Sequence, residues 1–194
     1  MIVVGIIGDI GSGKSFVAKQ FGYPVFNADY EVNKIYKKNK VCFLKLKAKL
    51  PKFIKSFPLD KNDLTNAILS NKKNLGKIIS IVHPLVRSRM NIFLKKNINR
   101  KMVVLDIPLL VENKLDRKEY VLVYVDSKKK QIYSRLKKRG NYNKRLLDIF
   151  KKIQKPLSMK KKLSSFIIKN DFKPQTVKKN IKILRRKILN KWKK

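Results

Sequence analysis

The stretch IVVGIIGDIGSGKS, from Ile2 to Ser15, decides which fold this chain is expected to adopt. Its first half is a run of apolar residues that favour β-structure, and Gly8 to Ser15 match the pattern G-x-x-x-x-G-K-[ST] at every position. A strand that is apolar on both faces is typical of a buried parallel sheet. The residues that follow, up to Phe21, favour a helix. The stretch therefore predicts a strand, a loop and a helix, which is the setting of a phosphate-binding loop.

The loop explains how a nucleotide could be bound. Glycines let backbone N–H groups curl around phosphates, and the start of the next helix adds its positive end. Lys14 would contact the β- and γ-phosphates, and the Ser15 hydroxyl would ligate Mg²⁺. A glycine-rich turn that binds nothing is the other interpretation. The residues expected to bind the nucleotide here are Gly8, Gly11, Ser12, Gly13, Lys14, Ser15 and Phe16.

Four more apolar runs predict further strands. They are Tyr23–Ala28, Met102–Leu105, Tyr120–Val125 and Phe166–Ile168. Helical patterns lie between them, and strands that alternate with helices predict an α/β fold with a parallel sheet. The chain has 194 residues, 43% of them hydrophobic, which is enough to bury a sizeable core.

Two long segments between the strands are expected to be helical insertions. The first, from about Glu31 to Lys101, is too long for one crossover helix. The second, from Ser127 to about Leu163, is rich in Lys and Arg. Separate helices in the first insertion are predicted at Glu31–Lys49, Lys61–Leu69, Lys73–Ile79 and Pro84–Lys96.

The expected organisation is a single unit with three parts. The core comprises residues 1–30, 101–127 and 164–194, the first insertion about 31–100 and the second about 128–163. Apolar residues at helical spacing between Gln175 and Trp192 predict an amphipathic helix that packs back on the core. They are Val177, Ile181, Leu184, Ile188 and Trp192.

Carboxylates follow two of the predicted strands. Asp29 comes just after the second strand, at the edge of an open α/β sheet where ligands bind. It could accept a proton from a hydroxyl nucleophile, or it could cap the next helix. Asp106 ends an apolar strand, as does the acidic residue that holds Mg²⁺ directly or through water in P-loop proteins. Glu112 follows on the same edge.

Two arginines in the second insertion are candidates for charge stabilisation. Arg135 and Arg139 are four residues apart and share a helix face. Brought over a triphosphate, they would stabilise the transferring phosphoryl group and exclude water. A solvated basic helix is the alternative.

The composition is strongly basic. Lys and Arg number 50 against 12 Asp and Glu, which gives a net charge of +38. Of the 50 cations 41 are Lys, spread along the whole chain, and this pattern fits compositional drift with solvated faces. A surface selected for polyanions would more often use Arg. Nucleic acid is therefore expected to bind only non-specifically.

The remaining composition excludes several classes. No run approaches the ~18 apolar residues of a membrane span. Cys42 is the single cysteine, so an internal disulfide is excluded. The first residues do not have the pattern of a signal peptide. We expect a cytoplasmic protein, and the sequence does not determine its oligomeric state.

Together the motifs resemble the dephospho-CoA kinase family. Gly8–Ser15 resembles its phosphate-binding loop, Asn27-Ala28-Asp29 its D-A-D motif, and Asp106–Glu112 its D-x-P-L-L-x-E segment. The resemblance runs from Ile6 to Asn170. Further similar positions, in the same order as in the family, are His83-Pro84-Leu85-Val86, Gln131, Arg135, Arg139, Gln154 and Asn170.

The resemblance implies a fold and a reaction. The fold would be a three-layer P-loop sandwich with a five-stranded parallel sheet, a helical CoA-binding insertion and a helical lid. The reaction would be transfer of the γ-phosphate of ATP to the 3′-hydroxyl of dephospho-CoA, the last step of CoA synthesis. Mg²⁺ would bind Ser15 and, through water, Asp106.

The resemblance also implies site residues. Asp29 would be the general base, with Lys14 and Arg139 as further catalytic residues. Nucleotide-binding residues would include Arg135, Arg139 and Asn170 besides the loop. Residues that bind the acceptor would be Asp29, His83, Arg87, Asp106, Leu109 and Glu112.

Several positions depart from the family pattern. Asp9 replaces a glycine and puts a negative charge beside the expected phosphates, and Asn27 replaces the first Asp of D-A-D. The other departures are Asn33, Ser164-Ser165 and Asp171-Phe172.

Two other functions are compatible with the sequence. A nucleoside or nucleotide kinase of the same fold is one, because a fold does not fix the acceptor. A polycationic protein that binds nucleic acid is the other. Asn113–Asp116 matches the N-K-x-D motif of GTPases, but it precedes a predicted strand and no D-x-x-G accompanies it, which disfavours a GTPase.

Overall fold

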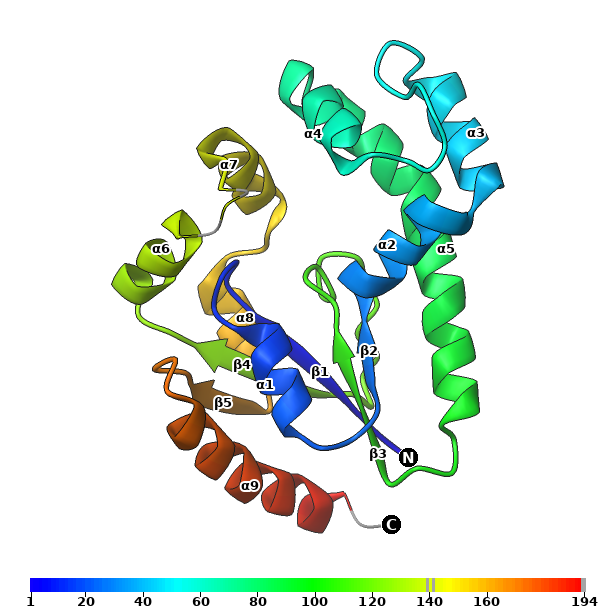
Figure 1. The fold of residues 1–194 in the computed structure, drawn as a ribbon. Helices are drawn as coiled ribbons and strands as arrows, with labels where there is room; N and C mark the ends of the chain where they lie inside the picture. Colours follow the sequence, from blue (N-terminus) through cyan, green and yellow to red (C-terminus); the bar gives the residue numbers. More distant parts are fainter. Residues whose placement is uncertain (139, 141, 193–194) are drawn as a thin grey trace. The chain divides into compact units, whose positions relative to one another are not determined.

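A computed structural model describes residues 1–138, 140 and 142–192 of the chain. The chain forms two compact units (Figure 1). The first comprises Met1–Asn27, Asn97–Tyr142 and Lys151–Lys194, and the second comprises Ala28–Lys96 and Asn143–Phe150.

The first unit contains a five-stranded parallel sheet with the strand order β2-β3-β1-β4-β5. Its strands are β1 (Ile2–Gly8), β2 (Val25–Asn27), β3 (Met102–Asp106), β4 (Val121–Asp126) and β5 (Phe166–Lys169). The predicted α/β class, the parallel sheet and the five strands are thereby confirmed. β1 is central, because Val4 pairs with Val104 of β3 on one side and Val121 of β4 on the other. The glycine-rich loop therefore leaves the sheet from its middle strand.

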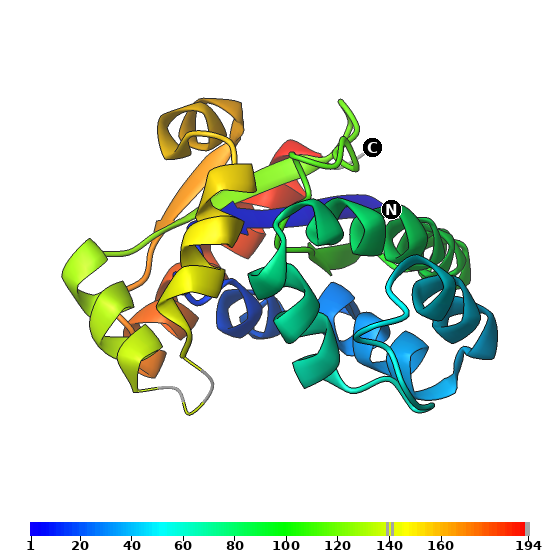
Figure 2. The ribbon, with the colours of Figure 1, turned by 90° about the horizontal axis from the view of Figure 1, so that it is seen from above.

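Helices cover both faces of this sheet. α1 (Lys14–Gln20) and α8 (Leu157–Leu163) lie on opposite faces (Figure 2). α9 (Pro174–Lys191) packs beside α1, and both helices contact the sheet. The amphipathic C-terminal helix is confirmed, since the four predicted residues from Val177 to Ile188 are buried in the core with Phe21. Trp192 is partly buried against the same core.

The segment between β4 and β5 is helical, as predicted. It contains α6 (Lys129–Lys137), α7 (Lys144–Ile153) and α8.

The second unit is built mainly from four helices. They are α2 (Ala28–Lys38), α3 (Lys40–Lys49), α4 (Lys61–Ser70) and α5 (Lys73–Lys96). The single helix expected at Glu31–Lys49 is wrong, because Asn39 takes an extended conformation and interrupts it. The side chain of Asn39 instead accepts a hydrogen bond of 2.8 Å from the backbone N–H of Cys42 and caps α3.

The predicted break between Lys73–Ile79 and Pro84–Lys96 is also wrong. α5 continues through Pro84, although proline removes a backbone hydrogen bond from a helix. Ile78, Val82, Val86 and Met90 recur at helical spacing across Pro84, and all are buried. α5 packs on α2, α3 and α4, so burial of this face outweighs the local cost of proline. Pro84 itself is exposed.

In the part of the chain that the structure describes, no helix combines the length and the apolar composition that crossing a bilayer requires. Cys42 is buried in the second unit and forms no disulfide.

Candidate active site

The loop between β1 and α1 has a backbone that requires glycine at two close contacts. Gly13 has φ 88°, and a Cβ atom there would overlap the side-chain nitrogen of Asn170. Gly11 has φ 83°, and a Cβ atom there would lie 3.0 Å from side-chain atoms of Ile132 and Leu136 in α6. The loop is thus enclosed by α6 and by the residues that follow β5.

Two strand ends hold the loop through one carbonyl group. The side-chain amide of Asn170, after β5, donates to the carbonyl oxygen of Ser12 at 2.7 Å. The hydroxyl of Ser127, after β4, donates to the same oxygen at 3.0 Å. Asn170 is buried, and it is one of the residues predicted to bind the nucleotide. Ser127 was not predicted, because only the folded chain brings its hydroxyl to the loop.

The loop offers donors to an anion. Lys14 is 8% exposed, and its ammonium group donates to the carbonyl oxygens of Asp9 at 2.7 Å and Gly8 at 3.4 Å. α1 begins at Lys14 with no side-chain hydrogen bond to cap it and no acidic residue in its first turn. The Ser12 hydroxyl is buried and has no hydrogen-bond partner among the described residues. Uncapped N–H groups, the helix dipole and a lysine together fit phosphate groups.

Asp9, the acidic departure within the loop, is held by local backbone. Its carboxylate accepts a 2.7 Å hydrogen bond from the N–H of Ile10. Part of its charge is thereby compensated within the loop itself.

A second departure, Asn27, has a clear physical partner. Asn27 and Asp106 end neighbouring strands and stand opposite each other in the register of β2 and β3. The amide of Asn27 donates to the Asp106 carboxylate at 2.6 Å, and Asp106 is only 3% exposed. The amide of Asn27 provides a donor where the family motif has a carboxylate, so no second negative charge stands opposite Asp106 in this chain. Sequence reasoning treated Asn27 only as a departure and missed this pairing.

Asp29 lies at the start of the second unit. α2 begins at Ala28, so Asp29 is inside the first helical turn rather than at the residue before the helix. A carboxylate in a first turn also interacts favourably with the helix dipole.

Of the two arginines predicted for the lid, the structure describes one. Arg135 lies on α6, and its guanidinium group stacks 4.6 Å above the ring of Phe172. Phe172 lies two residues after Asn170. The backbone N–H of Phe172 donates a hydrogen bond of 2.9 Å to the side-chain oxygen of Asn170. Arg139 lies outside the described residues.

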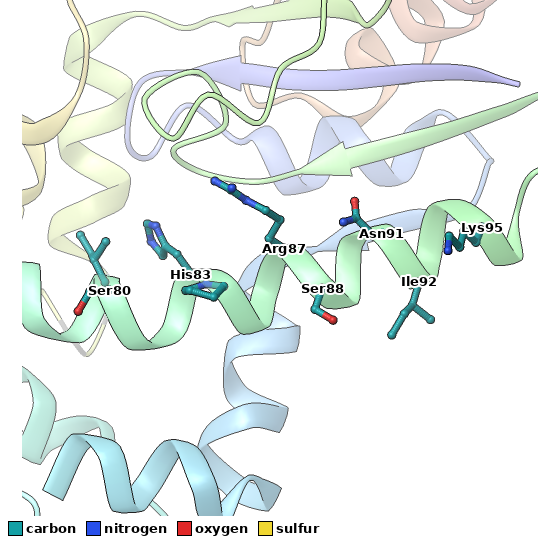
Figure 3. Close-up of a pocket in the computed structure, with 9 residues that line it drawn as sticks. Ser80, His83, Arg87, Ser88, Asn91, Ile92 and Lys95 are labelled. Carbon is teal, nitrogen blue, oxygen red and sulfur yellow. The ribbon is translucent and has the colours of Figure 1, made fainter. Parts of the chain in front are cut away.

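His83 and Arg87 line a pocket of about 610 Å³ along α5 (Figure 3). His83, Arg87 and Asn91 project from the same side of the helix, spaced by four residues. Burial, and then the positive charge of Arg87, lower the pKa of His83. His83 and Pro84 lie in the middle of α5.

Leu109 and Glu112 lie in the turn that follows β3. Leu109 is half-buried. The Glu112 carboxylate forms an ion pair of 2.6 Å with Lys160 and accepts a hydrogen bond from the backbone N–H of Lys155 at 3.0 Å. Sequence reasoning did not single out Lys160, because nothing distinguishes it locally from the other lysines.

The glycine loop on a central parallel strand, followed by a helix and flanked by a strand-end carboxylate, defines a P-loop nucleotide-binding protein. The family model described as dephospho-CoA kinase (CoaE) matches residues 2–175. This chain belongs to the dephospho-CoA kinase family, and it is an ATP-dependent phosphotransferase.

Two curated relatives agree with this assignment, and two solved structures have the same fold. The chain is 34% identical over 188 residues to a dephospho-CoA kinase of Wolbachia from Brugia malayi, covering 93% of this chain and 95% of the relative. It is 30% identical over 200 residues to a dephospho-CoA kinase from Bacillus thuringiensis, and the match covers 98% of this chain and 97% of the relative. A crystal structure from Thermus thermophilus has TM-score 0.75 and 26% identity over 96% of this chain and 97% of the other. The Campylobacter jejuni dephospho-CoA kinase, at TM-score 0.66 and 19% identity, covers 97% of both chains and has the same fold.

Proposed function

We propose that this protein transfers the γ-phosphate of ATP to the 3′-hydroxyl of dephospho-CoA and forms CoA and ADP. The observation that carries the proposal is the loop from Gly8 to Ser15 at the end of the central strand, next to the buried carboxylate of Asp106. Family membership supplies the identity of the acceptor. The reaction is the last step of CoA synthesis, and the proposed location is the cytoplasm.

In this proposal the loop holds the triphosphate. The N–H groups of the loop and of the first turn of α1 bind phosphate oxygens, and Lys14 leaves its carbonyl partners to bind the β- and γ-phosphates. Phe16, on the same turn, is partly exposed and borders the nucleotide. Arg135 and Arg139 stabilise charge on the transferring group.

Ser15 and Asp106 suit a divalent cation that accompanies ATP. Hydroxyl and carboxylate oxygens are ligands that Mg²⁺ accepts, and Mg²⁺ usually keeps several waters. Ser15 would bind it directly, and Asp106 through water. When bound, Mg²⁺ neutralises phosphate charge. Asn27 keeps the Asp106 carboxylate in place by its 2.6 Å hydrogen bond.

Asp29 is the proposed general base. Its carboxylate would accept the proton of the 3′-hydroxyl as the oxygen attacks the γ-phosphorus. The proposed acceptor-binding residues of the second unit are His83 and Arg87 of α5, and those of the first unit are Asp106, Leu109 and Glu112.

The first experiment measures ADP release from ATP and Mg²⁺ with dephospho-CoA, and in parallel with AMP, CMP, dTMP, adenosine and pantothenate. Turnover with dephospho-CoA and not with the others supports the proposal. Turnover with a nucleotide instead would assign a different acceptor to the same fold. ATP binding that is absent altogether would contradict the role of the loop.

The role of Asp29 gives a sharper test. We expect Asp29→Asn to lower kcat by about 10²- to 10⁴-fold, as loss of a general base does, with little change in ATP binding. Asp63→Asn is a matched control, because Asp63 lies in the first turn of another helix, α4. Steady-state kinetics and ATP titration measure both variants. A nearly normal kcat for Asp29→Asn would remove this residue from the base role.

A further inference from the structure

Glu112 and Lys160 form an ion pair in the interior of the first unit. Their charged atoms are 2.6 Å apart, and the side chains are 8% and 1% exposed. Among the described residues, Lys160 and Lys14 are the buried lysines in a chain with 41 of them. A lysine side chain is almost never fully buried unless its charge is paired.

Each partner belongs to a different segment. Glu112 lies in the turn between β3 and β4, whereas Lys160 lies on α8, in the chain that leads to β5. The same oxygen of Glu112 also accepts the backbone N–H of Lys155, just before α8, at 3.0 Å. One carboxylate therefore fastens the turn to both the entrance and the middle of α8.

The turn is closed by hydrogen bonds within its own backbone. Its backbone N–H groups at Leu110, Asn113 and Leu115 donate to carbonyl groups within the same turn at 3.0 to 3.2 Å. Leu110 is fully buried. Leu109 and Glu112 are one helical turn apart, so a shift of the Glu112 anchor also moves Leu109.

Stability alone does not account for such a pair. Removing two charges from water is expensive, and apolar residues of similar volume often replace a buried ion pair without loss of stability. What the ion pair provides beyond apolar packing is a defined position, because a carboxylate with two donors at hydrogen-bond distance has little freedom.

We propose that Lys160 is a positioning residue, which acts through Glu112 to fix the turn after β3 and hence the acceptor-binding residue Leu109. Glu112 anchors this turn, because one of its carboxylate oxygens meets both the Lys160 ammonium group and the backbone N–H of Lys155. This inference rests on the proposed function for its kinetic consequence, but its structural part does not.

The variants Lys160→Met and Glu112→Gln test the proposal. We expect each to lower kcat/KM for dephospho-CoA by about 10- to 100-fold, mainly through KM, because small displacements of binding groups have effects of this size. The KM for ATP should stay within about twofold, since the loop and Lys14 are not involved. Lys161→Met is the matched control: the neighbouring lysine pairs with Asp126 at 3.1 Å, but both side chains are well exposed.

A double variant separates positioning from mere stability. In E112L/K160M the buried charges are gone, so the urea midpoint should recover towards that of the wild type. Because the anchor to Lys155 is also gone, the raised KM for dephospho-CoA should persist. Recovery of both the midpoint and the KM would overturn the proposal and leave a structural role only.

Hydrogen exchange provides a readout that needs no acceptor. We expect faster exchange at the N–H groups of Leu110, Asn113 and Leu115 in Lys160→Met than in Lys161→Met. If the wild type shows no turnover with dephospho-CoA, the proposed function fails while this comparison still decides the positioning role. Equal exchange in the two variants would overturn it.

Discussion

At the scale of single residues, the site depends on two positions that meet distant parts of the chain. Gly13 leaves room for the Asn170 amide, and Asn27 donates a hydrogen bond to the Asp106 carboxylate. Both residues act on groups far away in the sequence. Asn170 comes from the end of β5, and Asp106 from the end of β3.

Gly13→Ala should therefore damage the loop, whereas Gly76→Ala should not. The new methyl group at position 13 would overlap Asn170 and force an L-residue to keep φ 88°. We expect a loss of about 1–3 kcal/mol in the free energy of unfolding and a higher KM for ATP. Gly76 lies in α5 with nothing within 4 Å of its Cβ position. Gly76→Ala should therefore raise the free energy of unfolding by about 0.5–1 kcal/mol. Urea denaturation of both variants measures this; equal effects would contradict the role of Gly13.

His83 should make stability depend on pH. Its pKa is lowered in the folded chain by burial and by Arg87, so the unfolded chain takes up a proton at higher pH than the folded chain. The stability due to neutral His83 is complete above its ordinary pKa of about 6.5 and is lost as the pH falls below it. Between pH 8 and pH 5.5, the urea midpoint of the wild type should fall more than the midpoint of His83→Gln. Parallel pH profiles would show that His83 titrates alike in both states.

At the scale of elements, the turn after β3 has two contacts with the rest of the first unit. One is the anchor to α8, and the other is a contact with β1. Leu110 packs over the backbone of Gly5 in β1, where a side chain would be too close. The absence of a Cβ atom at Gly5 thus determines how near this turn lies to the sheet.

Gly5→Ala should push the turn away from the sheet. The added methyl group would lie 2.5 Å from one methyl carbon of Leu110 and 2.9 Å from one of Leu122. We expect a loss of about 1–3 kcal/mol in the free energy of unfolding from overpacking. Adding Leu110→Val, which removes a methylene, should restore part of it. Thermal or urea denaturation of the single and double variants is the measurement, and an unchanged midpoint in Gly5→Ala would contradict this packing.

At the scale of the whole molecule, the net charge of +38 is the dominant electrostatic feature. Twelve acidic residues cannot neutralise 50 cations, so like charges repel one another across the folded chain. Exposed pairs such as Lys161 with Asp126 contribute little against this.

Salt should therefore stabilise the protein. Raising NaCl from 50 mM to 500 mM shortens the Debye length and screens the repulsion. We expect a gain of about 1 kcal/mol, or a rise of roughly 2–4 °C in Tm for a chain of this size. Thermal unfolding monitored by circular dichroism at the two salt concentrations checks this. A Tm that falls with salt would mean that attractive pairs outweigh the repulsion.

The sequence by itself determined the α/β class, the five strands, the phosphate-binding loop and the family. These features are carried by local patterns: apolar runs, a glycine motif and residues at strand ends, whose meaning does not depend on distant contacts. The amphipathic C-terminal helix was predictable for the same reason, since its apolar spacing is visible in the chain.

Only the tertiary structure decided the continuity of α5 through Pro84, the pairing of Asn27 with Asp106 and the burial of Lys160 against Glu112. Local rules argue against the first of these and are silent on the other two. Each depends on residues far apart in sequence, whose packing and hydrogen bonds outweigh local preference once the chain folds. Lys160 is one of 41 lysines in the sequence, and it differs from the others because the fold buries it beside the Glu112 carboxylate.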